Sequence, residues 1–333
     1  MTTPLRLGIA GLGTVGVGVV KIIQRQSDLL ATRCGRPITI TAVSARDRTK
    51  DRGVSVDTYG WEDDPTALAV RDDVDIFVEL VGGVDGPAVT AVRAAIAAGK
   101  DVVTANKAML AVHGHTLAQA AEGRGRVLRF EAAVAGGIPI IKTLTEGLAG
   151  NTIDRVMGVM NGTCNYILTR MENADLTYTQ AFEKADALGY LEADPKLDVG
   201  GIDAAHKLTL LAAIAYGTQV NFGAVALEGI ESITIEDIRR AGDMGYKIKL
   251  LGVAQMNGRG LEQRMSPCLV PATSPLGQLD GGTNMIVLQG NNVGQIVLRG
   301  AGAGAGPTAS AVLSDVCDIA RGIRVPTVGI PAT

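Results

Sequence analysis

A glycine-rich segment near the N-terminus, GLGTVG at residues 11–16, constrains the fold more than any other feature of the sequence. It follows an apolar run at residues 5–10 that is typical of a buried strand, and it opens a helical pattern at residues 14–30. The three glycines suit a tight turn, a close backbone approach to a ligand, and close packing of helix on strand. The free N–H groups of the helix start favour phosphate. This context predicts a dinucleotide-binding turn, with a ligand-free glycine turn as the alternative. The expected contact residues are Gly11, Leu12, Gly13, Thr14, Val15 and Gly16.

The alternation of strand and helix patterns predicts an α/β fold with a doubly wound (Rossmann) parallel sheet. Hydrophobic residues make up 47% of the chain but aromatic residues only 3%, so the core must consist of Ala, Val, Leu and Ile. Such a core suits parallel strands covered by helices. Further strands are expected at residues 38–45, 74–80, 101–106 and 127–134, and an alanine-rich helix at residues 86–100.

The pattern changes after residue 137, which we take as the end of the first domain (residues 1–137). A second, α+β domain is expected at residues 138–305, and a last helix within 306–333 is expected to pack back on the first domain. The second domain should hold helices near 138–149, 179–188 and 202–216, and strands near 153–161, 247–256, 284–289 and 293–298.

Charge and cysteine content exclude several classes of function. The net charge of −3 gives no electrostatic basis for binding nucleic acid or an anionic membrane. No apolar run is long enough for a membrane span, and no signal peptide is evident. The four cysteines are widely spaced, which disfavours disulfides and zinc and indicates a reducing cytoplasm.

The end of the second strand should select the cofactor. An acid there would bind the ribose 2′-OH of NAD, but the strand runs into Val43-Ser44-Ala45-Arg46. Arg46 could pair with the 2′-phosphate of NADP, so NADP is favoured over NAD. An ordinary solvated loop is the alternative.

Two lysines are candidates for chemistry. Lys107 directly follows a strand, where ligands bind in open α/β sheets, and a lysine is unfavourable at a helix start. Lys207 and Asp203 lie four residues apart on an expected apolar helix, within the acid-rich segment GYLEADPKLDVGGIDAAHKL at 189–208. They are either a buried pair that needs a ligand or a surface ion pair, and spacing alone does not choose. We expect the first part of this segment, up to Gly201, to be a loop.

Two further motifs place polar or small residues next to apolar elements. MNGTCNYIL at residues 160–168 supplies several neutral hydrogen-bonding groups, with Thr163 as a candidate helix cap. RGAGAGAGPT at residues 299–308 is either a second dinucleotide contact or a flexible linker.

Together these segments, with TANK and EAAVAGGIP, resemble homoserine dehydrogenase over almost the whole chain. The resemblance implies NAD(P)-dependent interconversion of L-homoserine and L-aspartate 4-semialdehyde in threonine, methionine and isoleucine biosynthesis. It implies a cytoplasmic homodimer whose second domain serves catalysis and dimerisation. The family's C-terminal ACT domain and fused aspartate kinase are not expected in 333 residues.

The resemblance also implies roles for single residues. Lys207 matches the acid/base lysine, and Lys107 matches a lysine near substrate and nicotinamide. Substrate-binding acids match Glu192, Asp198 and Asp203. Further cofactor contacts match Gly189 and Gly304. A monovalent cation site, usually described for sodium, matches Glu131 with the backbone oxygens of Val134, Gly136 and Ile138.

Two rival functions make different demands on the chain. An aspartate-semialdehyde dehydrogenase would need a cysteine nucleophile, for which Cys164 is the candidate. A nucleotide-sensing module would keep the glycine turn but would not need both lysines and the acidic segment.

Overall fold

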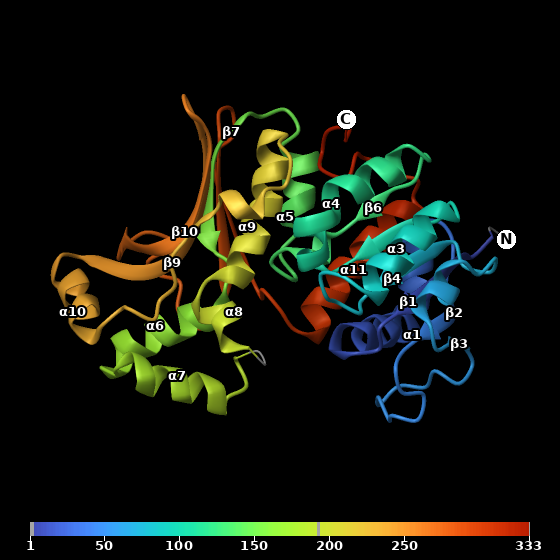
Figure 1. The fold of residues 1–333 in the computed structure, drawn as a ribbon, viewed down its shortest axis with the longest axis horizontal. Helices are drawn as coiled ribbons and strands as arrows, with labels where there is room; N and C mark the ends of the chain where they lie inside the picture. Colours follow the sequence, from blue (N-terminus) through green and yellow to red (C-terminus); the bar gives the residue numbers. More distant parts are fainter. Residues whose placement is uncertain (1–2, 192–193, 333) are drawn as a thin grey trace. The chain divides into compact units, whose positions relative to one another are not determined.

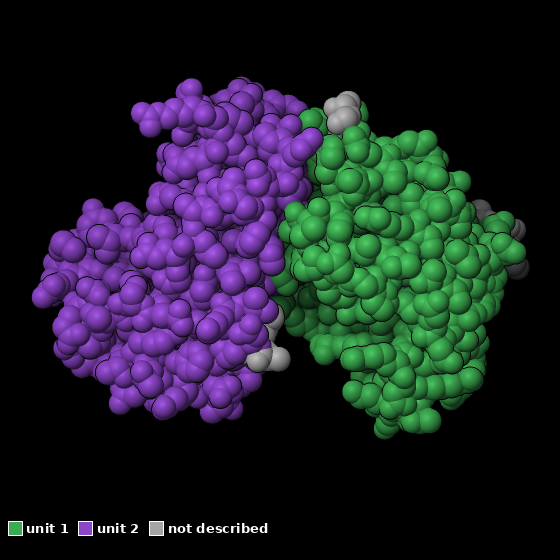
Figure 2. Space-filling model, in the orientation of Figure 1, with its two compact units in different colours: residues 1–145, 303–333 green, residues 146–302 purple. Residues whose placement is uncertain are grey.

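The computed structural model describes residues 3–191 and 194–332 and divides the chain into two units (Figures 1 and 2). Unit 1 comprises Met1–Thr145 and Ala303–Thr333, and unit 2 comprises Glu146–Gly302. The last helix thus belongs to the first unit. The N-terminal segment of this unit ends at Thr145, beyond the expected boundary at residue 137. Within the described residues, no helix combines the length and apolarity needed to cross a bilayer.

Unit 1 contains a six-stranded parallel sheet in the order β3-β2-β1-β4-β5-β6. This order, which reverses direction beside β1, confirms the expected doubly wound sheet. The strands are β1 (Leu5–Ala10), β2 (Ile38–Ser44), β3 (Gly60–Glu62), β4 (Ile76–Glu79), β5 (Asp101–Thr104) and β6 (Leu128–Arg129).

Helices supply the remaining layers of unit 1. They are α1 (Thr14–Cys34), α2 (Pro65–Ala69), α3 (Pro87–Ala97), α4 (Lys107–Glu122), α5 (Ile140–Lys142) and α11 (Ala305–Ala320). Although they are far apart in sequence, α1 and α11 pack against each other. Ile9 of β1, Val19 of α1 and Val312 of α11 are fully buried in one apolar cluster. Each such side chain contributes about 1.5–3 kcal/mol to folding.

Unit 2 contains a mixed sheet in the order β12-β11-β7-β9-β10-β8, antiparallel except where β8 joins β10. Its strands are β7 (Ile153–Val159), β8 (Ala226–Leu227), β9 (Tyr246–Asn257), β10 (Gly260–Pro271), β11 (Asn284–Gly290) and β12 (Gly294–Gly300). Its helices are α6 (Gly162–Ala174), α7 (Tyr178–Ala187), α8 (Pro195–Val199), α9 (Ile202–Tyr216) and α10 (Ile235–Asp243). Helix α9 contacts β7, β9 and β10, which makes it central to the unit.

Three local predictions are wrong. The strand expected at 127–134 ends at Arg129, because a 3-10 turn follows at Glu131–Ala133 and the N–H of Glu131 donates to Asp315 of α11. The helix expected at 138–149 is the short α5 followed by a π-helical turn at Thr143–Gly147. The loop expected before Gly201 contains α8, which starts at a proline and is capped by the preceding aspartate.

Candidate active site

The glycine turn between β1 and α1 has the geometry that a bound dinucleotide requires. Gly11 has a φ of +97°, and a Cβ there would overlap the carbonyl oxygen of Leu80. A Cβ at Gly16 would overlap the carbonyl oxygen of Gly11. A Cβ at Gly13, by contrast, would meet nothing within 4 Å. Gly13 caps α1 without a side-chain hydrogen bond, so the open space beside it faces free helix N–H groups.

A cleft of about 590 Å³ lies beside this turn, entirely within unit 1. Its lining combines the glycine turn, the ends of β2 and β4, and several charged side chains: Gly11, Leu12, Gly13, Ser44, Ala45, Arg46, Asp47, Lys50, Arg52, Asp63, Pro65, Leu80, Val81 and Pro87. A cleft at the carboxyl ends of parallel strands is where such sheets bind ligands. The residues present therefore fit a dinucleotide.

Arg52 is a cleft residue that the sequence analysis missed. Its guanidinium donates to the carbonyl oxygens of Leu12, at 3.3 Å, and Lys50, at 2.9 Å. It also lies 5.8 Å from the centroid of the Trp61 ring, as does that of Arg48. Arg52 thus ties the loop after β2 to the glycine turn.

A buried carboxylate shapes the next strand end. Glu79, the last residue of β4, accepts hydrogen bonds from the backbone N–H groups of Val81 and Gly82, at 2.8 and 2.9 Å, and from Thr104 Oγ1 at 2.5 Å. Asn106 caps α4 and donates to the carbonyl oxygen of Gly83. Lys107 is the first residue of that helix.

In unit 2, Lys207 and Asp203 form a buried ion pair on α9. Lys207 Nζ lies 2.7 Å from Asp203 Oδ2 and 2.8 Å from the carbonyl oxygen of Met160. The two side chains are only 10% and 9% exposed. The alternative of a solvated surface pair is therefore wrong, and burial at this depth requires the partners that both groups have.

Asn161 connects this pair to the acidic segment. Its Nδ2 donates to Asp198 Oδ1 at 2.8 Å and to Asp203 Oδ2 at 3.4 Å. Its Oδ1 accepts from the N–H of Cys164, so Asn161 caps α6. The expectation of Thr163 as the cap is wrong, because Thr163 Oγ1 donates instead to the carbonyl oxygen of Tyr190.

Asn284 on β11 is a second residue that the sequence did not signal. Its Nδ2 donates to the Met160 carbonyl oxygen at 3.2 Å, the same atom that Lys207 contacts. Its Oδ1 is buried without a hydrogen-bond partner among the described residues. A hydrogen-bonding amide thus lies beside the Lys207 ammonium.

The remaining predicted contacts fall in different places. Glu192 lies outside the described residues. Gly189 ends the turn after α7 with a φ of +71° and belongs to unit 2. Gly304 caps α11 with a φ of +117° and belongs to unit 1. The structure therefore brings Asp198, Asp203 and Lys207 together, and separately the glycine turn and Arg46.

The segment predicted to bind a cation forms one buried loop of unit 1. Val134 and Ile138 are 0% and 2% exposed. Ala135 and Gly136 have φ values of +57° and +55°. A left-handed conformation is strained for alanine, and such strain concentrates at functional sites.

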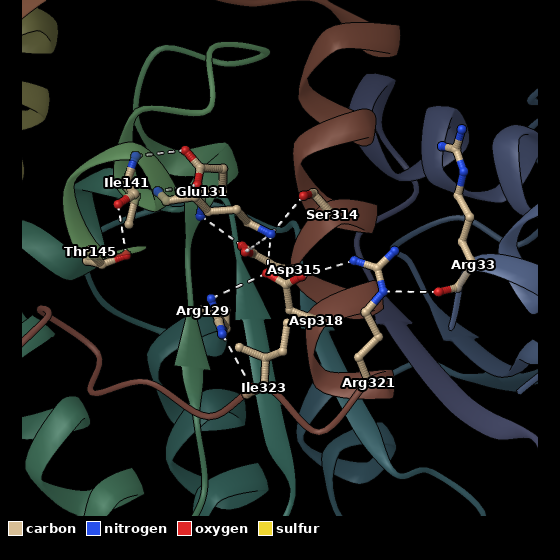
Figure 3. A network of polar contacts seen from close by, with 11 residues as sticks. Arg33, Arg129, Glu131, Ile141, Thr145, Ser314, Asp315, Asp318, Arg321 and Ile323 are labelled. Carbon is tan, nitrogen blue, oxygen red and sulfur yellow. Dashed lines mark hydrogen bonds and ion pairs between the residues drawn. The ribbon is translucent and has the colours of Figure 1, made fainter. Parts of the chain in front are cut away.

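Glu131 begins this loop and is part of a buried polar network (Figure 3). Its carboxylate accepts from the N–H groups of Ile141 and Lys142, both at 2.9 Å, and its own N–H donates to Asp315 on α11. The Lys142 ammonium contacts Asp318 and Ser314. Burial, together with the neighbouring Asp315, raises the pKa of Glu131 to about 7.

Comparison with known proteins identifies the family. A model described as homoserine dehydrogenase matches residues 139–317, and one described as the homoserine dehydrogenase NAD-binding domain matches residues 11–131. The homoserine dehydrogenase of Neisseria gonorrhoeae is 44% identical over 97% of this chain and 74% of its own length. The chain belongs to the homoserine dehydrogenase family. The homoserine dehydrogenase of Bacillus subtilis is likewise 40% identical to this chain, over 98% of this chain and 75% of its own length.

Solved structures of homoserine dehydrogenases agree with the fold. The enzyme from Thiobacillus denitrificans superposes with a TM-score of 0.95 at 41% identity, covering 99% of this chain and 78% of that one. A hyperthermophilic archaeal homoserine dehydrogenase in complex with NADPH gives a TM-score of 0.80 at 26% identity, covering 95% and 97%. The chain is thus an NAD(P)-dependent oxidoreductase acting on a small molecule, as the sequence predicted.

The cysteine-dependent alternative has no support. Cys164 is fully buried, and its Sγ donates to the carbonyl oxygen of Asp198 at 3.2 Å. Burial raises the pKa of this thiol far above its usual range. A protonated, inaccessible thiol is a poor nucleophile, so Cys164 does not fit the role that an aspartate-semialdehyde dehydrogenase would require.

Proposed function

We propose that Lys207 is the proton donor and acceptor in the interconversion of L-aspartate 4-semialdehyde and L-homoserine. The observation that carries this proposal is the buried ammonium held between Asp203 and the Met160 carbonyl oxygen. An ammonium has three hydrogens, and among the described residues these two acceptors are the ones within hydrogen-bonding distance. The third hydrogen is available to a substrate oxygen.

In the reductive direction, Lys207 first polarises the aldehyde oxygen and then protonates the alkoxide. The nicotinamide supplies the hydride when it is bound. In the oxidative direction, the neutral lysine takes the proton from the hydroxyl of homoserine. Asp203 orients the amine throughout, since it bonds to the same nitrogen.

The acids of the segment around α8 hold the amino group of the substrate in this proposal. Asp198 is 3% exposed and bonded to Asn161, which also contacts Asp203. Asn161 thereby sets the spacing of the two carboxylates. Glu192 is assigned to the same role from the family resemblance, and Lys107 to a place near substrate and nicotinamide.

The direct test is a spectrophotometric assay with purified protein. Homoserine should drive reduction of NADP or NAD, and aspartate semialdehyde should drive the reverse reaction. Absence of homoserine-dependent turnover with both cofactors would overturn the assignment.

We also propose that NADP is preferred. Arg46, Lys50 and Arg52 line the cleft, so cations surround the end of β2. Two acids also line the cleft: Asp63 accepts a hydrogen bond from Trp61 Nε1 at 2.8 Å, and Asp47 accepts hydrogen bonds from the N–H and the hydroxyl of Thr49, each at 2.8 Å. A carboxylate committed to Thr49 competes poorly for a ribose hydroxyl. The relative solved with NADPH is consistent with this preference.

A monovalent cation, with sodium as the candidate, is proposed to bind the loop from Glu131 to Ile138. The supporting observation is the left-handed pair Ala135 and Gly136, which turns a buried backbone sharply. Carbonyl and carboxylate oxygens are the donors that hard cations accept. Replacing sodium by a bulky organic cation at constant ionic strength should lower thermal stability, whereas an unchanged melting temperature would contradict the site.

Homodimerisation and a cytoplasmic location complete the proposal and rest on the family resemblance. Several apolar side chains of unit 2 are exposed, among them Leu269 (52%) and Met244 (59%). Exposed apolar surface of this kind is common at subunit contacts. Sedimentation equilibrium would measure the mass in solution.

A further inference from the structure

Unit 2 contains a second buried lysine that the proposed chemistry does not use. Lys249 on β9 is 1% exposed, and its ammonium donates to the carbonyl oxygen of Leu279 at 2.6 Å and to Asn165 Oδ1 at 3.1 Å. The carboxylate of Asp280 lies 3.8 Å away. Burying an ammonium is costly, so these bonds must be firmly made in the folded state.

One of the two acceptors of Lys249, the Leu279 carbonyl oxygen, belongs to a short segment, residues 279–282, between β10 and β11; the other, Asn165 Oδ1, is on α6. Asn165 on α6 donates from Nδ2 to the carbonyl oxygens of Leu279 and Gly281, at 3.1 and 2.7 Å. The N–H of Gly281 donates to Thr169 Oγ1 at 3.3 Å. The segment is therefore fixed from two sides, by α6 and by β9.

The same segment packs against residues at the substrate side of unit 2. A Cβ at Gly162 would overlap the carbonyl oxygen of Gly282, and one at Gly282 would lie 2.8 Å from the Tyr190 ring. The Tyr190 ring stacks on Tyr166 with centroids 4.5 Å apart. Gly162 follows Asn161, the residue that bonds Asp198 and Asp203.

We propose that Lys249 is a positioning residue for the amino-acid substrate, acting through the segment 279–282 on the start of α6 and on Tyr190. The proposal rests on the assignment of Asp198, Asp203 and Lys207 to the substrate. Lys249 itself touches none of these three side chains; it fixes the support against which Asn161 and Tyr190 are packed.

The charges around Lys249 make its effect dependent on pH. Asp280 faces it from the segment, Lys247 from its own strand and Glu172 from α6. Burial lowers the pKa of Lys249 and Asp280 partly opposes this shift, which leaves the pKa at about 8. Hydrogen bonds from a charged donor are about twice as strong as neutral ones. The hold on the segment therefore weakens as pH rises through about 8.

The test compares Lys249→Met with Lys247→Met in the full-length enzyme. Lys247 is a matched control, because it lies two residues away and contacts Asp280 and Glu172. Lys249→Met should raise the KM for homoserine about fivefold, as for residues coupled through shared contacts. Its kcat and its KM for NADP should stay within about twofold of wild type, as should all parameters of Lys247→Met.

Two further measurements separate positioning from general stability. Wild-type KM for homoserine should rise above about pH 8, Lys249→Met should lack that rise, and Asp280→Asn should show it at lower pH. Asn165→Ala should also raise the KM for homoserine. The double variant Lys249→Met/Asn165→Ala should raise this KM by less than the product of the two single-variant factors. Asn165→Ala also carries the test if Lys249→Met does not fold.

Either of two results would overturn the inference while leaving Lys207 in place. One is an unchanged KM for homoserine in folded Lys249→Met and Asn165→Ala. The other is an equal change in kcat and in both KM values. Both are read against a wild-type enzyme that turns over homoserine, so they are distinct from failure of the proposed function.

Discussion

The cleft of unit 1 and the Lys207 cluster of unit 2 differ in the groups that they offer to a ligand. The cleft offers backbone N–H groups beside Gly13 and exposed side chains such as Arg46. The cluster offers buried ionised side chains, with Lys207 and Asp203 each about a tenth exposed. A backbone site tolerates side-chain changes unless they fill the ligand's space, whereas removing one member of a buried pair leaves the other charged and unpartnered.

This difference predicts that substitutions in the cluster act on the chemical step and those in the cleft act on cofactor affinity. The cluster should also give the larger effects, because it contains Lys207, the group proposed to transfer the proton. Three sets of substitutions, in order of decreasing effect, examine this contrast.

The largest effect is expected from Lys207→Ala. Loss of a general acid/base lowers kcat by about 10² or more, and the KM for NADP should change little. Lys184→Ala, an exposed lysine on α7, is the matched control and should behave as wild type. Initial rates measure the effect, and a melting curve shows whether loss of the lysine beside the buried Asp203 destabilises the fold. Near-wild-type turnover would remove Lys207 from the mechanism.

The contrast between the two regions also explains what the sequence could predict. The glycine turn and the strand–helix alternation depend on residues close together in the chain, so their patterns were sufficient. The Asp203–Lys207 pair was found because a helix brings residues four apart onto one face. The burial of the pair could not be predicted, because it depends on strands β7, β9 and β10, which contact α9 but are distant from it in the sequence.

The contacts that were missed join residues far apart in the sequence. Arg52 bonds to a carbonyl 40 residues earlier, Lys249 to one 30 residues later, and Asn284 to one 124 residues earlier. No local pattern specifies such partners. A sequence signal for Lys249 does exist. It lies within the mostly apolar strand sequence YKIKLLGVA, where a buried lysine requires polar partners.

The prediction of Thr163 as the cap of α6 is wrong for a related reason. Thr163 and Asn161 are both good capping residues, and the sequence does not say where the helix begins. The structure selects Asn161, because its amide also serves Asp198 and leaves Thr163 to bond Tyr190. Asn161 is favoured because it caps the helix and also donates to a distant carboxylate, whereas Thr163 could supply only the local cap.

An intermediate effect is expected from a pair of glycine substitutions in the cleft. Gly13→Ala puts a methyl group into space that the protein leaves open, so the melting temperature should hold while the Kd for NADP rises about tenfold or more. Gly16→Ala places its methyl against the Gly11 carbonyl oxygen and should destabilise the fold by about 1–3 kcal/mol. Thermal melting and cofactor titration separate the two. Unaltered cofactor affinity in Gly13→Ala would mean that the dinucleotide does not approach this part of the turn.

The smallest effect is expected from Arg46→Ala, because an exposed ion pair contributes only about 1 kcal/mol. Its removal should raise the KM for NADP about fivefold. The KM for NAD should not change, since NAD lacks the 2′-phosphate. Arg48→Ala is the matched control, because the Arg48 guanidinium lies over the Trp61 ring. Equal losses with both cofactors would mean that Arg46 supports the cleft as a whole. The contrast between the two regions would then need revision, because an exposed side chain of unit 1 would support the structure of its site, as the buried groups around Lys207 do in unit 2.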